Sequence, residues 1–298
     1  MKDAGIYPRA QLLAMGYDDH SIRKAVRAGS LIRLRIGWFA TPNADETAMA
    51  AVRDGGVLTC VDALAFHELW IPPGHKDRLH MRRSRSMRGK NRACRPLQGY
   101  LTTADRAVDS IAVALSCAAR CLSAEEWIAV CDSYMNATGK SLGDLAQELD
   151  GAGPTVTDRL GRTERLSQSG TESIARLRLR AVGYNVVVQP QVDGVGRVDL
   201  RIGVLLIECD SMLYHASKED YERDHHRDRR AMVAGWLKLR LTYDDIIYDW
   251  EGVLADIREI TRAERHRARS VRKRALVERS VRQSLTGGSV PSNEDWGC

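Results

Sequence analysis

The pattern of apolar and polar positions predicts short helices at the start of the chain and short strands near its end. Residues 8–15 predict a helix that begins at a proline, where the missing amide proton costs least. Asp18 or Asp19 can cap a second helix that runs to about Ala28, with Ile22 facing inward. Glycines follow both helices and predict their ends.

The next segment, residues 31–40, predicts a β-hairpin that Gly37 interrupts. Two short helices followed by a hairpin make the plan of a winged helix, whose second helix enters the major groove of DNA while the wing touches the backbone. A helical hairpin with charged outer faces would give the same pattern, and the basic second helix favours the DNA-binding interpretation. The residues expected to contact DNA here are Arg23, Lys24, Arg27, Arg33 and Arg35.

The remainder of the chain predicts an α+β protein built from several parts. Helical spacing covers residues 103–149, where a packing role is the simplest interpretation, and the glycine-rich and polar stretch 151–170 predicts a linker. The elements expected after it are a helix at 171–182, strands at 185–192, 197–202 and 205–210, a helix at 217–234 and a strand at 236–242. The expected parts are a winged-helix domain with a basic segment at 1–100, a helical segment at 101–150, the linker at 151–170, an α-β-β-β-α-β core at 171–262, and a basic helix with a disordered tail at 263–298.

Composition limits the classes of protein to which the chain can belong. Its 298 residues are enough for two hydrophobic cores. No apolar run approaches the roughly 18 residues that cross a bilayer, and no signal peptide is visible, so we expect a cytoplasmic protein without a membrane partner. The seven cysteines are scattered and form no CxxC pair, which predicts reduced thiols with neither a disulfide framework nor a zinc site.

Positive charge is concentrated in two stretches, although the net charge is only +6. One stretch covers residues 76–95 and the other residues 262–282. Clustered arginine and lysine neutralise phosphates, while solvated surface faces give the same pattern. The scarcity of aromatic residues among them argues against stacking on single strands and favours double-stranded DNA as the partner. The further residues expected to contact DNA are Arg82, Arg83, Arg85 and Arg227.

Acidic residues on two neighbouring predicted strands suggest a site for a divalent cation, because buried carboxylates need a partner or a metal. A two-residue turn at residues 203–204 would place Asp199 opposite Glu208, and alternation would put Asp210 on the same face. Carboxylate oxygens suit Mg²⁺ or Mn²⁺, for which Asp199 and Glu208 would be the ligands. The whole prediction depends on this register, since a shift by one residue would separate the two acids.

Other residues could complete a site for phosphodiester hydrolysis. Glu172 lies at the start of a predicted helix, and Asp210 is a third acid beside the two metal ligands. His215 has the side chain of a general base or acid near neutral pH. The simpler alternative is that the carboxylates pair with arginines, for which Arg197, Arg201 and Arg240 are the candidates.

Two segments resemble known families. Residues 5–70 resemble the winged-helix domain of AbiEi-family antitoxins of type IV toxin–antitoxin systems, through the stretches at residues 5–13, 28–40 and 56–69. This resemblance implies DNA binding, often at the protein's own operator, and a toxin as a partner. Residues 168–249 resemble the very-short-patch-repair endonuclease-like domains of the PD-(D/E)XK superfamily, through Glu172, Val198-Asp199-Leu200, Ile207-Glu208-Cys209-Asp210, His215, Arg227-Asp228 and residues 235–242.

The second resemblance implies a restriction-endonuclease-like domain at 171–262. The lysine that usually follows the second acid by two residues is Asp210 here, as in the repair-type subgroup, and Ser211 replaces that subgroup's usual glycine. Two functions are therefore expected from the sequence. One is a DNA-binding protein with a magnesium-dependent DNA endonuclease domain. The other is a non-enzymatic antitoxin or transcriptional autorepressor that retains an inactive nuclease fold.

Overall fold

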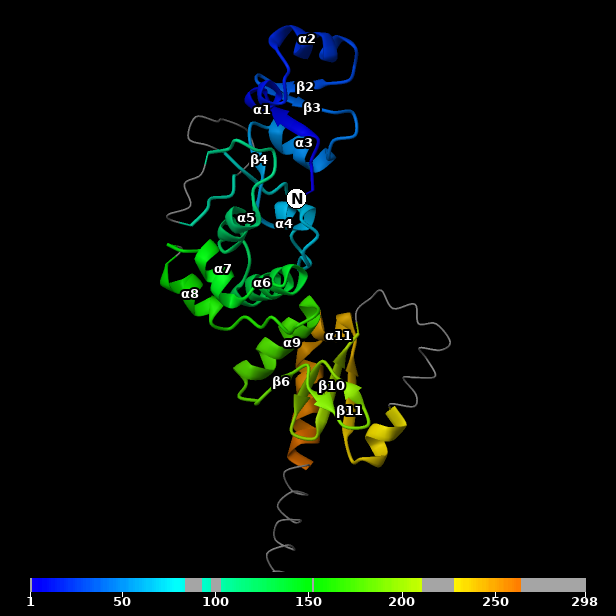
Figure 1. The fold of residues 1–298 in the computed structure, drawn as a ribbon. Helices are drawn as coiled ribbons and strands as arrows, with labels where there is room; N and C mark the ends of the chain where they lie inside the picture. The colour runs from blue at the N-terminus through cyan, green and yellow to red at the C-terminus, as the bar shows by residue number, and fades with distance from the viewer. Residues whose placement is uncertain (1, 84–92, 98–102, 152, 211–227, 264–298) are drawn as a thin grey trace, which may run out of the picture. The chain divides into compact units, whose positions relative to one another are not determined.

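The computed structural model describes residues 2–83, 93–97, 103–151, 153–210 and 228–263, and these form a mixed α+β structure (Figure 1). The chain divides into two compact units. The first contains residues 1–192 and 197–200, and the second contains residues 193–196 and 201–298, so that the division passes through one strand of a sheet.

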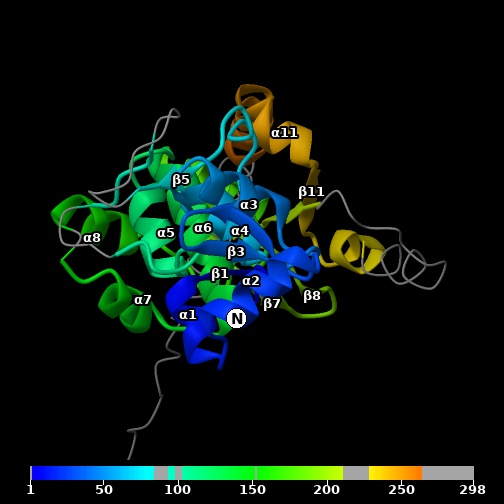
Figure 2. The same ribbon diagram turned by 90° about the horizontal axis from the view of Figure 1, so that it is seen from above.

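The N-terminal part of the first unit is a small α/β subdomain. Its elements are β1 (Ile6–Pro8), α1 (Arg9–Ala14), α2 (Asp19–Arg27), β2 (Ile32–Arg35) and β3 (Trp38–Ala40). The three strands form an antiparallel sheet in the order β1-β3-β2, and Figure 2 shows the same elements from above. The two predicted helices and the predicted hairpin are confirmed.

Local interactions explain why α2 begins and ends where it does. Asp18 accepts a hydrogen bond from Ser21 N at 2.6 Å, while Ser21 Oγ accepts one from Asp18 N at 2.8 Å, so each residue satisfies a free amide of the first turn. Gly16, with φ of +92°, makes the turn between α1 and α2, and Gly29, with φ of +75°, follows the end of α2. Arg9 of α1 also binds Asp19 of α2 through two hydrogen bonds.

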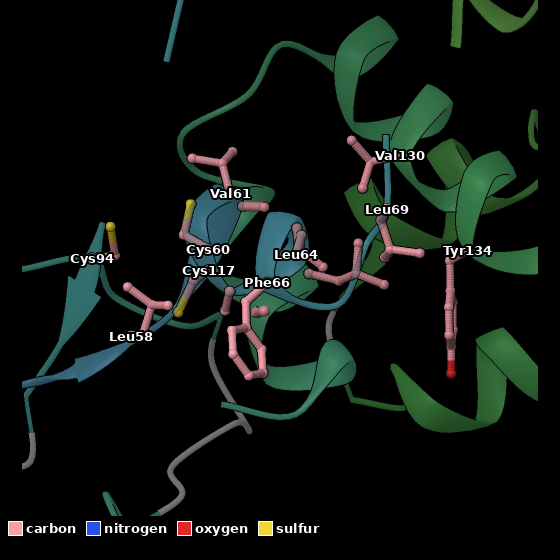
Figure 3. Close-up of a cluster of buried hydrophobic side chains, with 14 of the residues drawn as sticks. Leu58, Cys60, Val61, Leu64, Phe66, Leu69, Cys94, Cys117, Val130 and Tyr134 are labelled. Atoms are coloured by element: carbon pink, nitrogen blue, oxygen red, sulfur yellow. The ribbon is translucent and has the colours of Figure 1, made fainter. Parts of the chain in front are cut away.

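The rest of the first unit is mainly helical. Its elements are α3 (Glu46–Arg53), β4 (Val57–Leu58), α4 (Cys60–Phe66), β5 (Met81–Arg82), α5 (Ile111–Ala118), α6 (Ala124–Thr138), α7 (Leu142–Glu148), α8 (Pro154–Leu160), α9 (Gly170–Ala181), β6 (Val187–Val188) and β7 (Gln191–Val192). The hydrophobic core includes side chains of α4, α5 and α6, several of which appear in Figure 3. The helices expected between residues 103 and 149 are confirmed as α5, α6 and α7, and Ser141 caps α7.

Helix α8 corrects the expectation that residues 151–170 form a linker. Pro154 occupies the first turn, and Val156 and Leu160, four positions apart, are both buried. Helix α8 packs against α6 and α7. The glycine and proline residues that suggested a linker therefore begin a short helix, and the polar residues after it are tied to the unit's interior.

A buried ion pair joins α6 to α9. Arg176 Nη2 donates to Asp132 Oδ2 at 2.7 Å, and the two side chains are 0% and 1% exposed. Arg176 Nη1 also donates to the carbonyl of Arg162, and the amide of Glu164 donates to Asp132 Oδ1. The pair thus satisfies backbone groups of the segment before α9 as well as fixing the two helices.

The end of the chain contributes a four-stranded sheet with the order β11-β10-β9-β6. Its further strands are β9 (Leu200–Ile202), β10 (Leu205–Cys209) and β11 (Leu237–Leu241), while β8 (Gly196–Arg197) forms a separate hairpin with β7. In the second unit β10 and β11 run parallel, and residues 228–233, α11 (Tyr243–Ile247) and residues 250–263 are helical. The expected strand 185–192 is divided into β6 and β7, because Gln189 between them has φ of +48°.

No helix among the described residues combines the length and the apolar composition that crossing a bilayer requires.

Candidate functional site

The outer face of α2 carries exposed cations. Arg23, Lys24 and Arg27 are exposed, whereas Ile22 is 4% exposed and packs with Leu12, Leu31 and Phe39 in a small core. The helix therefore has one face fixed to the subdomain and one cationic face turned to solvent, as the sequence predicted. His20 in its first turn is exposed as well.

The β2–β3 hairpin adds a second exposed feature to this surface. Arg33 is exposed, and Ile36 at the tip is 86% exposed beside Gly37, which has φ of +75°. Arg35 differs, because its guanidinium lies 5.0 Å from the centre of the Trp38 ring and burial lowers its pKa. Arg35 therefore packs against the hairpin as well as contributing charge to it.

Two arginines expected to contact DNA lie inside the first unit, which corrects that prediction. Arg82 is 3% exposed and donates two hydrogen bonds to Asp109 at 2.6 and 2.7 Å. Arg83 forms an ion pair with Asp54 at 2.5 Å. A run of arginines gives the same charge pattern whether its members reach solvent or bind buried carboxylates, so the sequence could not separate the two. Arg85, His215 and Arg227 lie outside the described residues.

A hydrogen-bonded acidic cluster lies in the first unit. Gln189 Nε2 donates to Glu172 Oε1 at 2.9 Å and to Asp199 Oδ1 at 3.1 Å, while the amide of Gln189 donates to the carbonyl of Asp199 at 2.8 Å. Glu172 and Asp199 thus share one amide group. Gln189 was not predicted as a site residue, since its role depends on the left-handed backbone between β6 and β7.

The carboxyl of Glu172 has a raised pKa. It is 1% exposed, and burial raises its pKa to about 7, an effect that hydrogen bonds from Gln189 and from the amide of Gln168 oppose. The nearby Asp199 raises the pKa further. Ser169 caps α9 by accepting a hydrogen bond from the amide of Glu172.

The raised pKa of Glu172 predicts a pH dependence of stability. Between the ordinary glutamate pKa of 4.5 and about 7 the folded state binds more protons at this carboxyl than the unfolded state does, so the free energy of unfolding falls as pH rises through that window. The expected fall from this group is on the order of 3 kcal/mol. Asp132, whose pKa burial raises to about 6, contributes with the same sign.

Urea denaturation at a series of pH values from 4 to 8 measures this effect. We expect Glu172→Gln to remove most of the slope that lies between pH 6 and 7, above the range in which Asp132 contributes. The exposed Glu46→Gln on α3 serves as the control and should keep that slope. Equal slopes for all three proteins would show that Glu172 does not titrate as described.

In the second unit, Glu208 is held by cations. Lys238 Nζ lies 2.9 Å and Arg240 Nε lies 3.3 Å from Glu208 Oε2, and Lys238 also binds Asp228 at 2.5 Å. The parallel register pairs Glu208 with Arg240 directly. The alternative in which arginines pair with the acids of the sheet is therefore confirmed for Arg240 and Glu208. The third acid, Asp210, is exposed.

Asp199 and Glu208 belong to different units, so their predicted juxtaposition stays a prediction. The expected alternation along β10 is only partly observed, because Leu205, Leu206 and Ile207 are all buried. A strand that is covered on both faces does not show the alternation of a half-exposed one.

Four other residues come together without any signal in the sequence pattern. They are Cys60, His80, Cys94 and Cys121, whose ligand atoms all lie within 4.8 Å of one another in the first unit. These three cysteines are far apart in the sequence, and separate segments of the fold bring them together in space. The expectation that the cysteines form no zinc site stays a prediction.

Comparison with known proteins gives no assignment. No family model matches the chain, and no curated protein matches it.

Proposed function

We propose that this protein binds double-stranded DNA through α2 and the β2–β3 hairpin. The observation that carries the proposal is the cationic face of α2, where Arg23, Lys24 and Arg27 are exposed on a helix whose opposite side is fixed in a core. A capped helix with a cationic, solvent-facing side suits insertion into the major groove, with phosphate contacts from the flanking elements.

The arrangement around α2 supports the same proposal. Helices α1 and α2 are joined by a short turn and followed by a hairpin, which is the plan of a winged helix. The resemblance of residues 5–70 to AbiEi-family antitoxin domains agrees with this plan. It further suggests an operator as the DNA site and a toxin as a protein partner.

Fluorescence anisotropy with labelled duplexes tests the proposal. Duplexes selected by the full-length protein from a random pool should bind more tightly than unselected duplexes, and the affinity for both should fall as salt rises. A protein that enriches no sequence and whose weak binding does not respond to salt would contradict it.

The second candidate is magnesium-dependent hydrolysis of DNA. The order α9, β6, β9, β10, a helical segment and β11, with a sheet of order β11-β10-β9-β6 and a parallel β10–β11 pair, supports a core of the PD-(D/E)XK type. Asp199 and Glu208 are ligands of the type that Mg²⁺ or Mn²⁺ prefers. Glu208, however, already faces Lys238 and Arg240, so the charge that a cation would neutralise is balanced by the protein itself.

This charge balance favours a non-enzymatic regulator that retains the nuclease fold. We expect purified full-length protein with Mg²⁺ or Mn²⁺ to nick supercoiled plasmid no faster than the Asp199→Ala, Glu208→Ala double variant. Nicking by the wild-type protein that the double variant loses would overturn this expectation and establish the endonuclease. The Asp193→Ala variant, which changes an exposed acid in the turn after β7, is the control for a general charge effect.

A further inference from the structure

A cluster of three cysteines and one histidine forms in the first unit from four separate segments. Cys60 is the first residue of α4, His80 directly precedes β5, Cys94 pairs with β5, and Cys121 lies just after α5. Cys60 and Cys94 lie at the same end of the hydrophobic core shown in Figure 3. Cys60, His80 and Cys94 are buried, and Cys121 is partly exposed.

Backbone hydrogen bonds fix these segments beside one another. Leu58 of β4 pairs with Met81 of β5, and the amide of Thr59 donates to the carbonyl of His80 at 3.0 Å. The amide of Cys94 donates to the carbonyl of Met81 at 2.7 Å. The positions of three of the four side chains are therefore set by the sheet and do not depend on contacts among the sulfur atoms.

The distances between the sulfur and nitrogen atoms of the cluster fit ligands of a tetrahedrally coordinated metal ion better than a disulfide between Cys94 and Cys121. Cys94 Sγ lies 3.9 Å from Cys121 Sγ and 3.5 Å from His80 Nδ1. Zinc–sulfur and zinc–nitrogen bonds of about 2.3 and about 2.0 Å place neighbouring ligand atoms of a tetrahedron about 3.5 to 3.8 Å apart. A disulfide would require about 2.05 Å, so the two thiols are not bonded to each other.

We propose that Cys60, His80, Cys94 and Cys121 bind one Zn²⁺ ion. Three thiolates and an imidazole are a donor set of structural zinc sites, and four protein ligands leave no open position for a substrate. The site would therefore stabilise the fold by joining α4, β5 and the end of α5, with no part in a reaction.

The surroundings of the cluster suit a metal–thiolate centre. Three thiolates and a neutral imidazole around Zn²⁺ carry one net negative charge. Arg78 Nη2 lies 3.4 Å from Cys121 Sγ, so the positive guanidinium would offset that negative charge. Asp62 accepts a hydrogen bond from the amide of His80 at 2.7 Å, which fixes the backbone at this ligand.

The ring of His80 turns one particular nitrogen toward the cysteines. Its side chain is buried, yet Nε2 has no hydrogen-bond partner among the described residues, so Nδ1 is the ring atom that faces other polar groups. Nδ1 is therefore the atom that would bind the metal, while Nε2 would keep no partner among the described residues.

Metal analysis of the purified full-length protein tests the proposal, with Cys131→Ala as the control because Cys131 is a fully buried thiol of α6 outside the cluster. We expect one zinc per chain in the wild-type and Cys131→Ala proteins. Zinc affinity should fall at least about 100-fold in Cys94→Ala and Cys121→Ala, since each loses a direct ligand. Unchanged zinc content in both cluster variants would overturn the assignment.

A second measurement keeps the proposal testable if the variants do not fold. The reduced wild-type protein, stripped of metal and titrated with Co²⁺, should show tetrahedral ligand-field bands and thiolate-to-cobalt charge transfer at one equivalent, and Zn²⁺ should displace the cobalt. No binding of either ion, or octahedral cobalt without thiolate bands, would overturn the site. Iron retained in place of zinc on purification would overturn the choice of metal.

Discussion

Replacing Arg23, Lys24 and Arg27 together with alanine is expected to weaken duplex DNA binding on the order of 100-fold to 1,000-fold at moderate salt. These three residues are exposed on α2, so their removal should take away contacts without disturbing the core that holds Ile22. Each lost phosphate contact should also reduce the slope of log affinity against log salt by about 1.

The control for this variant carries the same change of charge at other places. Arg53, Arg120 and Arg165 are exposed cations of the first unit outside α2 and the hairpin. Their triple alanine variant should keep most of the affinity, because long-range attraction alone is screened within about 10 Å at ordinary salt. Equal losses in the two triple variants would mean that net charge, and not the surface of α2, determines binding.

Replacing Arg176 with alanine is expected to lower the free energy of unfolding of the first unit by about 3 to 5 kcal/mol. The substitution leaves the carboxylate of Asp132 buried without its cation, although the amide of Glu164 still donates to it. Burial already raises the pKa of Asp132 to about 6 with the arginine present, so a charged Asp132 is costly at this position.

A neighbouring arginine on the same helix provides the matched control. Arg178 forms an ion pair with Glu125 in which the side chains are 25% and 27% exposed, and its replacement by alanine should cost less than about 1 kcal/mol. An Asp132→Asn, Arg176→Met double variant should recover part of the loss, because it removes both charges. Urea denaturation that gives similar losses for Arg176→Ala and Arg178→Ala would contradict this account of the pair.

Sequence patterns were sufficient where structure depends on neighbours along the chain. The cap at Asp18, the glycines after α1 and α2, and the interruption at Gly37 located both helices and the hairpin. Strand β1 was missed because three residues ending in Pro8 form a strand only through pairing with β3, more than twenty-five residues later. The same holds for α8, whose burial depends on α6 and α7.

The candidate sites were less predictable because they depend on distant partners. The acids Glu172, Asp199 and Glu208 could be picked out as carboxylates among apolar residues, but the shared amide of Gln189 and the cation of Lys238 could not. The cysteines gave no signal since their spacing fits no motif, and only the pairing of β4 with β5 brings Cys60 and His80 together.

The position of α2 on DNA is the claim on which the proposed function depends most. A photo-reactive phenylalanine analogue at His20, in the exposed first turn of α2, should crosslink to bases of a selected duplex, because the start of such a helix lies nearest the base edges. The same analogue at the exposed Gln147 of α7 should not. Crosslinking to bases from position 147 but not from position 20, in a protein that still binds the duplex, would contradict the account.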